Sequence, residues 1–159
     1  MSDRNLMSMT DGEVAAFLDQ GRRAYVATNG EDGWPHVVPM SYVVIDGEVT
    51  FWTDPASRKV RHLRSDPRIT CLVEDGDTVE EFRAVQLKGM AVISDDPEES
   101  ARTGEALFAR AAPGGQLTDE ARAYAAGLAP MRVAVRLRPE HVVSWDHRKI
   151  AVNLQDIGS

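Results

Sequence analysis

The sequence predicts a mainly β protein, a small antiparallel β-barrel with helices packed outside it. About six strand-like segments follow one another through short links. One helix is expected after the third segment and two more before the last, so the regular strand–helix alternation of a doubly wound α/β protein is missing. Long, closely linked strands favour a barrel. At 159 residues, the chain (1–159) is expected to form a single domain.

The first expected element is a helix over residues 10–21, "TDGEVAAFLDQG". Thr10 and Glu13 have the spacing of a capping box, in which each side chain binds the backbone N–H of the other residue. Gly21 is a typical residue for a helix end. The apolar stripe that would face the core consists of Val14, Phe17 and Leu18.

Three strands follow, at residues 23–29, 35–45 and 48–53. The links "GEDG" and "DG" contain glycines, which adopt the positive φ angles of hairpin turns without strain. Pro35 and Pro39 cannot donate a ladder hydrogen bond. The second strand is therefore expected to lie at a sheet edge, or to carry a bulge or bend near Pro39.

A cationic helix is expected next, although the chain has a formal net charge of −7. The segment "TDPASRKVRHLRSDPR" carries five Arg and Lys residues and only two acids, Asp54 and Asp66. Asp54 can cap a helix whose first turn contains Pro55. A helix start after Thr53 would offer free backbone N–H groups and a positive dipole end, which attract a phosphate or carboxylate. A solvated basic surface helix is the alternative.

The second half of the chain predicts two further strands, two helices and a last strand. Their expected ranges are 69–75, 82–94, 97–111, 118–129 and 132–139. Gln86 lies in the middle of the 82–94 strand, on the face of Phe82 and Ala84. A buried amide needs hydrogen-bond partners, which here are either backbone groups or a heterocyclic ligand.

Composition and motifs exclude several classes of protein. A pI near 5.1 argues against broad nucleic-acid binding. No apolar run reaches the length of a membrane span, and "MSDRNLMSMT" lacks the pattern of a signal peptide. The single cysteine, Cys71, lies in an apolar run and is expected to be a buried structural thiol, compatible with a reducing cytoplasm. No metal-binding or hydrolase motif occurs.

The segment "SWDHRK" brings a tryptophan, Trp145, close to several charged residues. Its Asp146 and His147 are adjacent, but neighbouring side chains of a strand point to opposite faces. A structural role is therefore favoured over a catalytic dyad.

The segment "FWTDPASRKVRHLRSDPRITCLVED" resembles the pyridoxamine 5′-phosphate oxidase-like split barrels, which bind flavins or deazaflavins. In that family a strand ending in Thr is followed by Thr-x-x-x-Ser-x-Lys and a helix that ends at a "DPR" turn. The closing "VAVRLRPEHVVSWDHRK" is similar to an actinobacterial branch that is often assigned to the deazaflavin coenzyme F420. The resemblance covers about residues 10–150 and implies a six-stranded antiparallel split β-barrel.

The resemblance also implies a cofactor site. Its phosphate contacts correspond to Thr53, Ser57, Arg58 and Lys59. The strand beneath the flavin ring corresponds to Pro39, Met40 and Ser41. Gln86 lies about two residues from a position that reaches the cofactor of the neighbouring subunit, and Trp145 is similar to a C-terminal tryptophan near that site. The implied assembly is a homodimer with the cofactor at the subunit interface.

The chain departs from the true oxidases at two positions of the second strand. Val38 and Val43 stand near places where those enzymes carry Arg and Lys for phosphate groups. This departure favours F420 over FMN and a hydride transfer to an organic small molecule. The alternatives are an FMN-binding reductase or oxidase and a non-catalytic carrier of flavin or haem, the latter with His36, His62, His141 or His147 as ligands. No catalytic residue is assigned; the candidate acids are His36, Tyr42 and His147.

Overall fold

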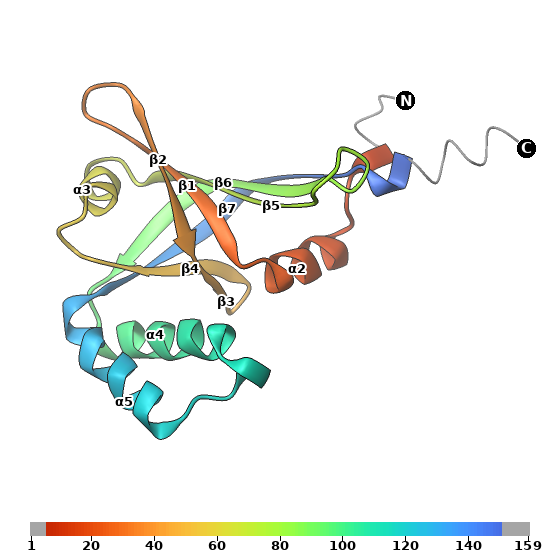
Figure 1. Cartoon of the computed structure of the whole chain (residues 1–159). Coiled ribbons are helices and arrows are strands. Elements are labelled where there is room, and N and C mark those ends of the chain that lie inside the picture. Colours follow the sequence, from red (N-terminus) through yellow and green to blue (C-terminus); the bar gives the residue numbers. More distant parts are fainter. Residues whose placement is uncertain (1–5, 151–159) are drawn as a thin grey trace, which may run out of the picture.

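The computed structural model describes residues 6–150, which contain a strongly curled, seven-stranded antiparallel sheet (Figure 1). The strand order is β2-β1-β5-β6-β7-β4-β3. The strands are Arg23–Asn29 (β1), Pro35–Ser41 (β2), Val43–Ile45 (β3), Glu48–Thr53 (β4), Arg68–Asp75 (β5), Arg83–Ser94 (β6) and Val133–Asp146 (β7). The edge strands β2 and β3 are consecutive in the chain, so the curled sheet forms a half-barrel. The predicted mainly β class with flanking helices is confirmed.

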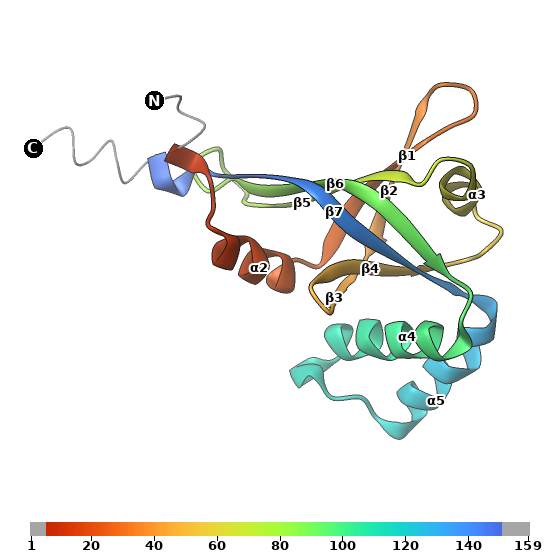
Figure 2. The ribbon, with the colours of Figure 1, turned by 180° about the vertical axis from the view of Figure 1, so that it is seen from behind.

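The helices surround this half-barrel. They are Asp11–Gln20 (α2), Arg58–Ser65 (α3), Pro97–Ala111 (α4) and Asp119–Leu128 (α5), with short 3₁₀ turns at Pro113–Gly115 (η1) and Ala129–Met131 (η2). Figure 2 shows α4 and α5 side by side below β3 and β4, while α2 and α3 lie at opposite ends of the sheet. None of the helices in residues 6–150 is long and apolar enough to cross a membrane.

The first helix has the ends that the sequence predicts. The side chain of Thr10 accepts a hydrogen bond from Glu13 N, and the carboxylate of Glu13 accepts one from Thr10 N. Gly21 is the C-cap residue. Phe17 and Leu18 are buried and join the core between the sheet and α2. The predicted Asp46–Gly47 hairpin turn is also present, with positive φ angles at both residues.

The predicted count of six strands is wrong because the second segment breaks into β2 and β3 at Tyr42. β2 pairs with β1, whereas β3 pairs with β4, so the chain crosses from one edge of the sheet to the other. The Tyr42 side chain is fully buried at this crossing, and its hydroxyl donates to Leu18 O at 2.6 Å. The prolines do lie on an edge strand, as expected, but the break comes three residues after Pro39.

The cationic helix also begins one turn later than predicted. Asp54 does not cap it: the Asp54 carboxylate accepts from Ala56 N at 2.7 Å, and Asp54 O accepts from Ser57 N. This turn occupies residues 54–57, so Ser57 is the N-cap residue and α3 starts at Arg58. Val60 and Leu63 are buried as the apolar pattern indicates.

The strands β6 and β7 continue past the end of β4, with β5 alongside β6 (Figure 1), and this stretch of the two strands is called the β6–β7 arm. From Val133 to Leu137, β7 pairs with both β4 and β6, whereas from Arg138 onward it pairs with β6 alone. The register shifts between Lys88 and Gly89, where a side chain at position 89 would collide with Arg138 O. β7 therefore runs seven residues past the predicted end at 139, and Trp145 lies within the strand.

Candidate functional site

The first turn of α3 carries cationic side chains without partners. Arg58, Lys59 and Arg61 make no ion pair or side-chain hydrogen bond with any residue that the structure describes. Burial lowers the pKa of Lys59, an effect that Asp54 partly opposes. Partial desolvation of an unpaired cation is unfavourable unless an anion approaches it.

The second half of the same helix is different. Arg64 forms an ion pair with Asp95 at 3.0 Å, and Arg68, just after the helix, forms one with Asp66 at 2.6 Å. Arg68 and Asn29 bind the carboxylate of Asp66 and hold its pKa well below the usual range. Available positive charge is therefore concentrated at the beginning of α3.

Two hydroxyl groups lie at the junction of β4 and α3. Ser57 Oγ is buried and has no hydrogen-bond partner within residues 6–150, although an N-cap hydroxyl usually accepts a backbone N–H. Thr53 ends β4 and is 6% exposed. An unsatisfied buried hydroxyl beside three unpaired cations fits a phosphate group, which accepts hydrogen bonds at each oxygen.

A pocket of about 330 Å³ separates α3 from the β1–β2 hairpin. Arg58 and Arg61 line it from the helix side. The hairpin side contributes Trp34 and His36 together with two acids, Glu31 and Asp32. The rings of His36 and His62 are 5.6 Å apart in an edge-to-face contact, and His62 Nδ1 lies 3.0 Å from Thr28 Oγ1. Burial, together with repulsion from Arg58, His62 and Lys59, lowers the pKa of His36.

Trp34 is a site residue that sequence reasoning missed. It is 76% exposed at the hairpin, although tryptophan is rarely so accessible. The signal in the sequence was a single tryptophan inside a polar turn, next to Pro35. An exposed indole at the mouth of this pocket can stack on an aromatic ligand.

The strand predicted to lie beneath a flavin ring presents only part of its predicted set. Pro39 and Ser41 are on the exposed face of β2, whereas Met40 points to the other face and packs against the core. Tyr25 pairs with Pro39 and is also exposed, as is Val37. The exposed face of β1 and β2 is thus a partly apolar platform.

Gln86 and Trp145 belong to the β6–β7 arm. Gln86 is half-buried opposite Val143, and its amide makes no side-chain hydrogen bond with the described residues. Trp145 pairs with Ala84 and packs on Phe82, with ring centroids 6.4 Å apart. The C-terminal end of β7 and α3 lie at opposite sides of the molecule (Figure 1), so one chain does not bring these two residues to the α3 cations.

Of the three candidate acids, His36 lines the pocket beside α3, and Tyr42 lines a separate pocket at the other end of β2. Tyr42 is buried, and desolvation raises its pKa to about 12, so it stays protonated as a structural donor. His147 Nδ1 lies 2.6 Å from Val79 O. Asp146 does not bind His147: it is buried and bonded to Arg148, which lowers the pKa of Asp146.

The cysteine has the predicted structural character. Cys71 is fully buried in β5, and burial raises its pKa to about 12. Of the four histidines, His36 and His62 are neighbours. His141 is exposed on β7, four strands across the sheet from His36 on β2. Within residues 6–150, no group of three His, Cys, Asp or Glu side chains is placed to hold a metal ion.

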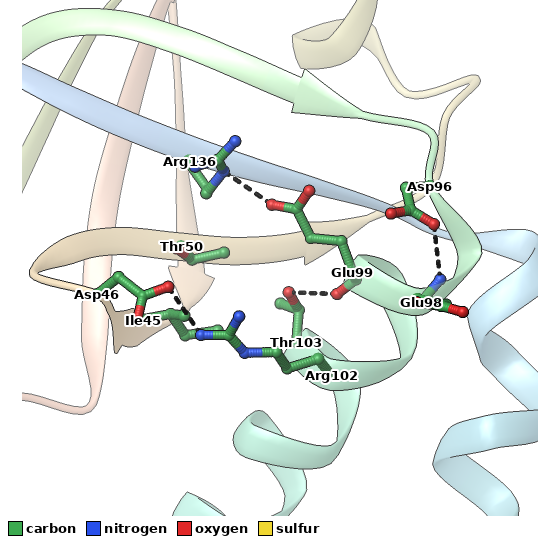
Figure 3. A pocket seen from close by; sticks show the side chains of 9 residues that line it. All are labelled: Ile45, Asp46, Thr50, Asp96, Glu98, Glu99, Arg102, Thr103 and Arg136. Carbon is green, nitrogen blue, oxygen red and sulfur yellow. Dashed lines mark hydrogen bonds and ion pairs between the residues drawn. The ribbon is translucent and has the colours of Figure 1, made fainter.

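A cavity of about 470 Å³, larger than the α3 pocket, lies between α4 and the β3–β4 hairpin (Figure 3). Its arginines have carboxylate partners. Arg136 Nε lies 2.7 Å from Glu99 Oε1, and Arg102 lies 2.8 Å from Asp46. Figure 3 shows these pairs directed at each other across the cavity. Its polar groups are largely satisfied within the chain.

This architecture, a curled antiparallel sheet whose edge strands are consecutive, is the class of split β-barrels. The sequence matches the model of the pyridoxamine 5′-phosphate oxidase family over residues 10–146. The chain therefore belongs to the pyridoxamine 5′-phosphate oxidase family, which confirms the resemblance drawn from the sequence. No curated protein matches the chain significantly.

Several solved structures share the fold of this chain. The conserved hypothetical protein Rv2991 from Mycobacterium tuberculosis is 39% identical, with a TM-score of 0.86 over 93% of this chain and 91% of that chain. An F420 reductase is 23% identical, with a TM-score of 0.63 over 80% and 93%. An FAD-binding protein from Mesorhizobium loti is 18% identical, with a TM-score of 0.66 over 86% and 94%. The last two show likeness of fold.

Proposed function

We propose that this protein is a cytoplasmic F420-dependent oxidoreductase that reduces an organic small molecule. The single observation that carries the proposal is the unpaired charge of Arg58 and Lys59 beside the unsatisfied Ser57 hydroxyl. With Thr53, these residues would hold the cofactor phosphate. Arginine grips two oxygens at once, and lysine supplies a point charge.

The choice of F420 over FMN is based on what the second strand lacks. Val43 is buried in the core and Val38 is half-buried, so neither position presents a cation to a flavin phosphate. The similarity of fold to an F420 reductase is compatible with this choice. An FMN-binding reductase or oxidase is the second candidate, favoured by the family itself and by the fold of an FAD-binding neighbour.

The proposal requires a homodimer. The α3 cations and the Gln86–Trp145 region lie far apart within one chain, so a second copy has to supply the latter to the same cofactor. Val142 and Val143 are exposed on the β6–β7 arm, and Val37 is exposed on β2. Exposed apolar side chains on two faces are available for burial between subunits.

In this mechanism the protein binds the cofactor and orients its ring. When bound, reduced F420 supplies a hydride from the deazaflavin C5. Pro39 and Ser41 would seat the ring on the exposed face of β2, and the phosphate contacts would fix its position along the strand. Coverage by the second subunit would exclude water from the ring. His36 is the described candidate closest to a proton-transfer role, because it faces a pocket and is held neutral by its lowered pKa.

A titration tests the proposal directly. The purified full-length apo-protein is titrated with F420 and, separately, with FMN, and ligand fluorescence is followed. We expect F420 to bind with a dissociation constant below about 100 μM, roughly −5.5 kcal/mol, and more tightly than FMN. Tighter FMN binding would establish the second candidate instead. Failure of both ligands to bind below that concentration would refute a cofactor role for the α3 site.

A further inference from the structure

A pocket lined by several arginines lies at the other end of β2. It has a volume of about 300 Å³ and lies where β1, β2 and the end of α4 meet. It is lined by Arg22, Arg23, Ser41, Tyr42, Leu107, Arg110 and Ala111. Three of these seven residues are arginines and none is acidic, in a chain whose net charge is −7. This composition is selective for anions.

Arg110 is fixed in place by contacts that do not neutralise it. Its guanidinium donates to Leu18 O at 3.1 Å and to Gly21 O, the open carbonyls at the end of α2. It also lies over the Tyr42 ring, 5.0 Å from the centroid. Since carbonyl groups and a neutral phenol carry no full charge, the positive charge of Arg110 remains available. Its other guanidinium nitrogens bind no described group.

Arg22 and Arg23 are equally free of counterions. Neither makes an ion pair or a side-chain hydrogen bond with any residue from 6 to 150. Arg22 and Arg23 also line a neighbouring pocket together with Glu74 and Asp75. Asp75 pairs with Arg83 there, and Glu74 forms no ion pair with either arginine. Asp19, on α2, has an electrostatic effect on Tyr42 without a hydrogen bond to it. The pocket beside Arg110 is therefore lined by three arginines and by no acidic residue.

The pocket continues the exposed face of β2. Arg23 pairs with Ser41 in the ladder, and directly paired residues share a face of the sheet. Tyr25 and Pro39 form the next pair on that face. β2 has seven residues, so the pocket beside α3 and the arginine-lined pocket are about 20 Å apart along this strand. One phosphate group cannot occupy both.

We propose that Arg22, Arg23 and Arg110 bind the carboxylate or phosphate group of an anionic acceptor. This inference rests on the proposed function, because it places the cofactor phosphate at α3 and the ring on Pro39 and Ser41. The next site along the same face is then the arginine pocket. Guanidinium groups bind carboxylates and phosphates through paired hydrogen bonds, which would orient the acceptor relative to the ring.

The test follows the backbone amide signals of the isotope-labelled apo-protein by NMR during titration with inorganic phosphate. We expect saturable shifts at Gly21, Arg23 and Ser41, separate from those at Ser57 and Lys59. In the double variant Arg22→Gln/Arg23→Gln, the dissociation constant reported by the first group should rise at least about tenfold, the loss of roughly one charge-assisted contact. The second group should be unchanged.

A matched control changes the net charge equally. Arg102 and Arg122 are exposed and paired with carboxylates, so Arg102→Gln/Arg122→Gln should leave phosphate binding at Gly21, Arg23 and Ser41 intact. Arg110 is left unchanged because its loss would expose the end of α2. An absence of shifts at these amides, or equal loss of binding in both double variants, would overturn the proposal.

Experiments on the cofactor-loaded protein test whether the anion in this pocket belongs to a separate acceptor or to F420 itself. We expect succinate to shift the Gly21, Arg23 and Ser41 amides in protein saturated with F420, and Arg22→Gln/Arg23→Gln to leave F420 affinity unchanged. If F420 abolishes the succinate shifts, or if the variant weakens F420 binding tenfold, the pocket holds part of the cofactor and the acceptor assignment is wrong. Phosphate binding here with no F420 binding would refute the proposed function while leaving the anion site in place.

Discussion

Two arginine-containing cavities of this protein differ in how their charges are balanced. In the cavity beside α4, Arg102 and Arg136 each face a carboxylate of the same chain. At the beginning of α3, Arg58, Lys59 and Arg61 form no ion pair within the described residues, although Glu31 and Asp32 line the same pocket. The α4 cavity is larger, yet its polar groups are already satisfied. Unpaired charge, rather than volume, is the reason for proposing the beginning of α3 as the cofactor site.

The largest expected effect concerns Lys59. Lys59→Ala removes an unpaired cation and should weaken F420 binding by about 1.5–3 kcal/mol, the range for a charge-assisted hydrogen bond. Arg64→Ala is the matched control, because Arg64 is on the same helix but already paired with Asp95. Fluorescence titration measures the affinity, and thermal unfolding shows whether the fold is intact. Equal affinities of Lys59→Ala and the wild type would mean that the phosphate lies elsewhere.

Substitution of Ser57 should lower cofactor affinity less than substitution of Lys59, without lowering stability. Its buried hydroxyl has no partner in the described structure, so Ser57→Ala should leave the free energy of unfolding unchanged or slightly raised. The same variant should lose about 0.5–1.5 kcal/mol of cofactor affinity, because the hydroxyl would bond the phosphate. Chemical denaturation and ligand titration separate the two quantities. A loss of stability without a loss of affinity would show that Ser57 only caps α3.

In the cavity beside α4, we expect a substitution to lower stability and to leave cofactor affinity unchanged. Glu99→Gln removes one of two carboxylates that face Arg136, the other being Glu48 at 3.3 Å. Both partners of the Glu99 pair are about a quarter exposed, so the free energy of unfolding should fall by about 1 kcal/mol. Cofactor affinity should not change. Weakened F420 binding in this variant would contradict the contrast between the two cavities.

The smallest expected effect is a shift in the pKa of His36. In the free protein this pKa should lie below 6.5, because burial and the neighbouring Arg58 disfavour the protonated ring. Arg58→Gln should raise it by less than about one unit, since it removes one repulsion. A bound anion should also raise it, so binding takes up a proton and affinity increases as the pH falls through the pKa of the complex. NMR titration of the His36 ring measures both shifts, and an unchanged pKa in Arg58→Gln would show that the two groups are not coupled.

Local patterns predicted much of this structure. Thr10, Glu13 and Gly21 marked both ends of α2, and Pro35 and Pro39 placed β2 at an edge. The break at Tyr42 was not predictable, because it depends on β2 and β3 finding different partners at opposite edges of the sheet. The late start of α3 arises from a local competition in which the Asp54 side chain forms a turn rather than a cap.

The cationic character of α3 was visible in the sequence, but the distribution of free charge along it was not. Asp95, which neutralises Arg64, lies about thirty residues away and could not be assigned to it from sequence alone. The arginine-lined pocket was even less predictable from the sequence. Arg22 and Arg23 meet Arg110 only because α4 returns to the end of α2, and no local motif marks such a meeting.

The free side of β7 has one more consequence. Beyond Leu137 this strand is bonded on a single side, and such an exposed backbone edge invites continuation of the ladder by a foreign strand. Arg138, Pro139 and Glu140 occupy the place where the edge opens: two charges and a residue that cannot donate. Charges and proline at a strand edge disfavour its pairing with another strand. We therefore expect a stable association of this arm to use its side-chain faces.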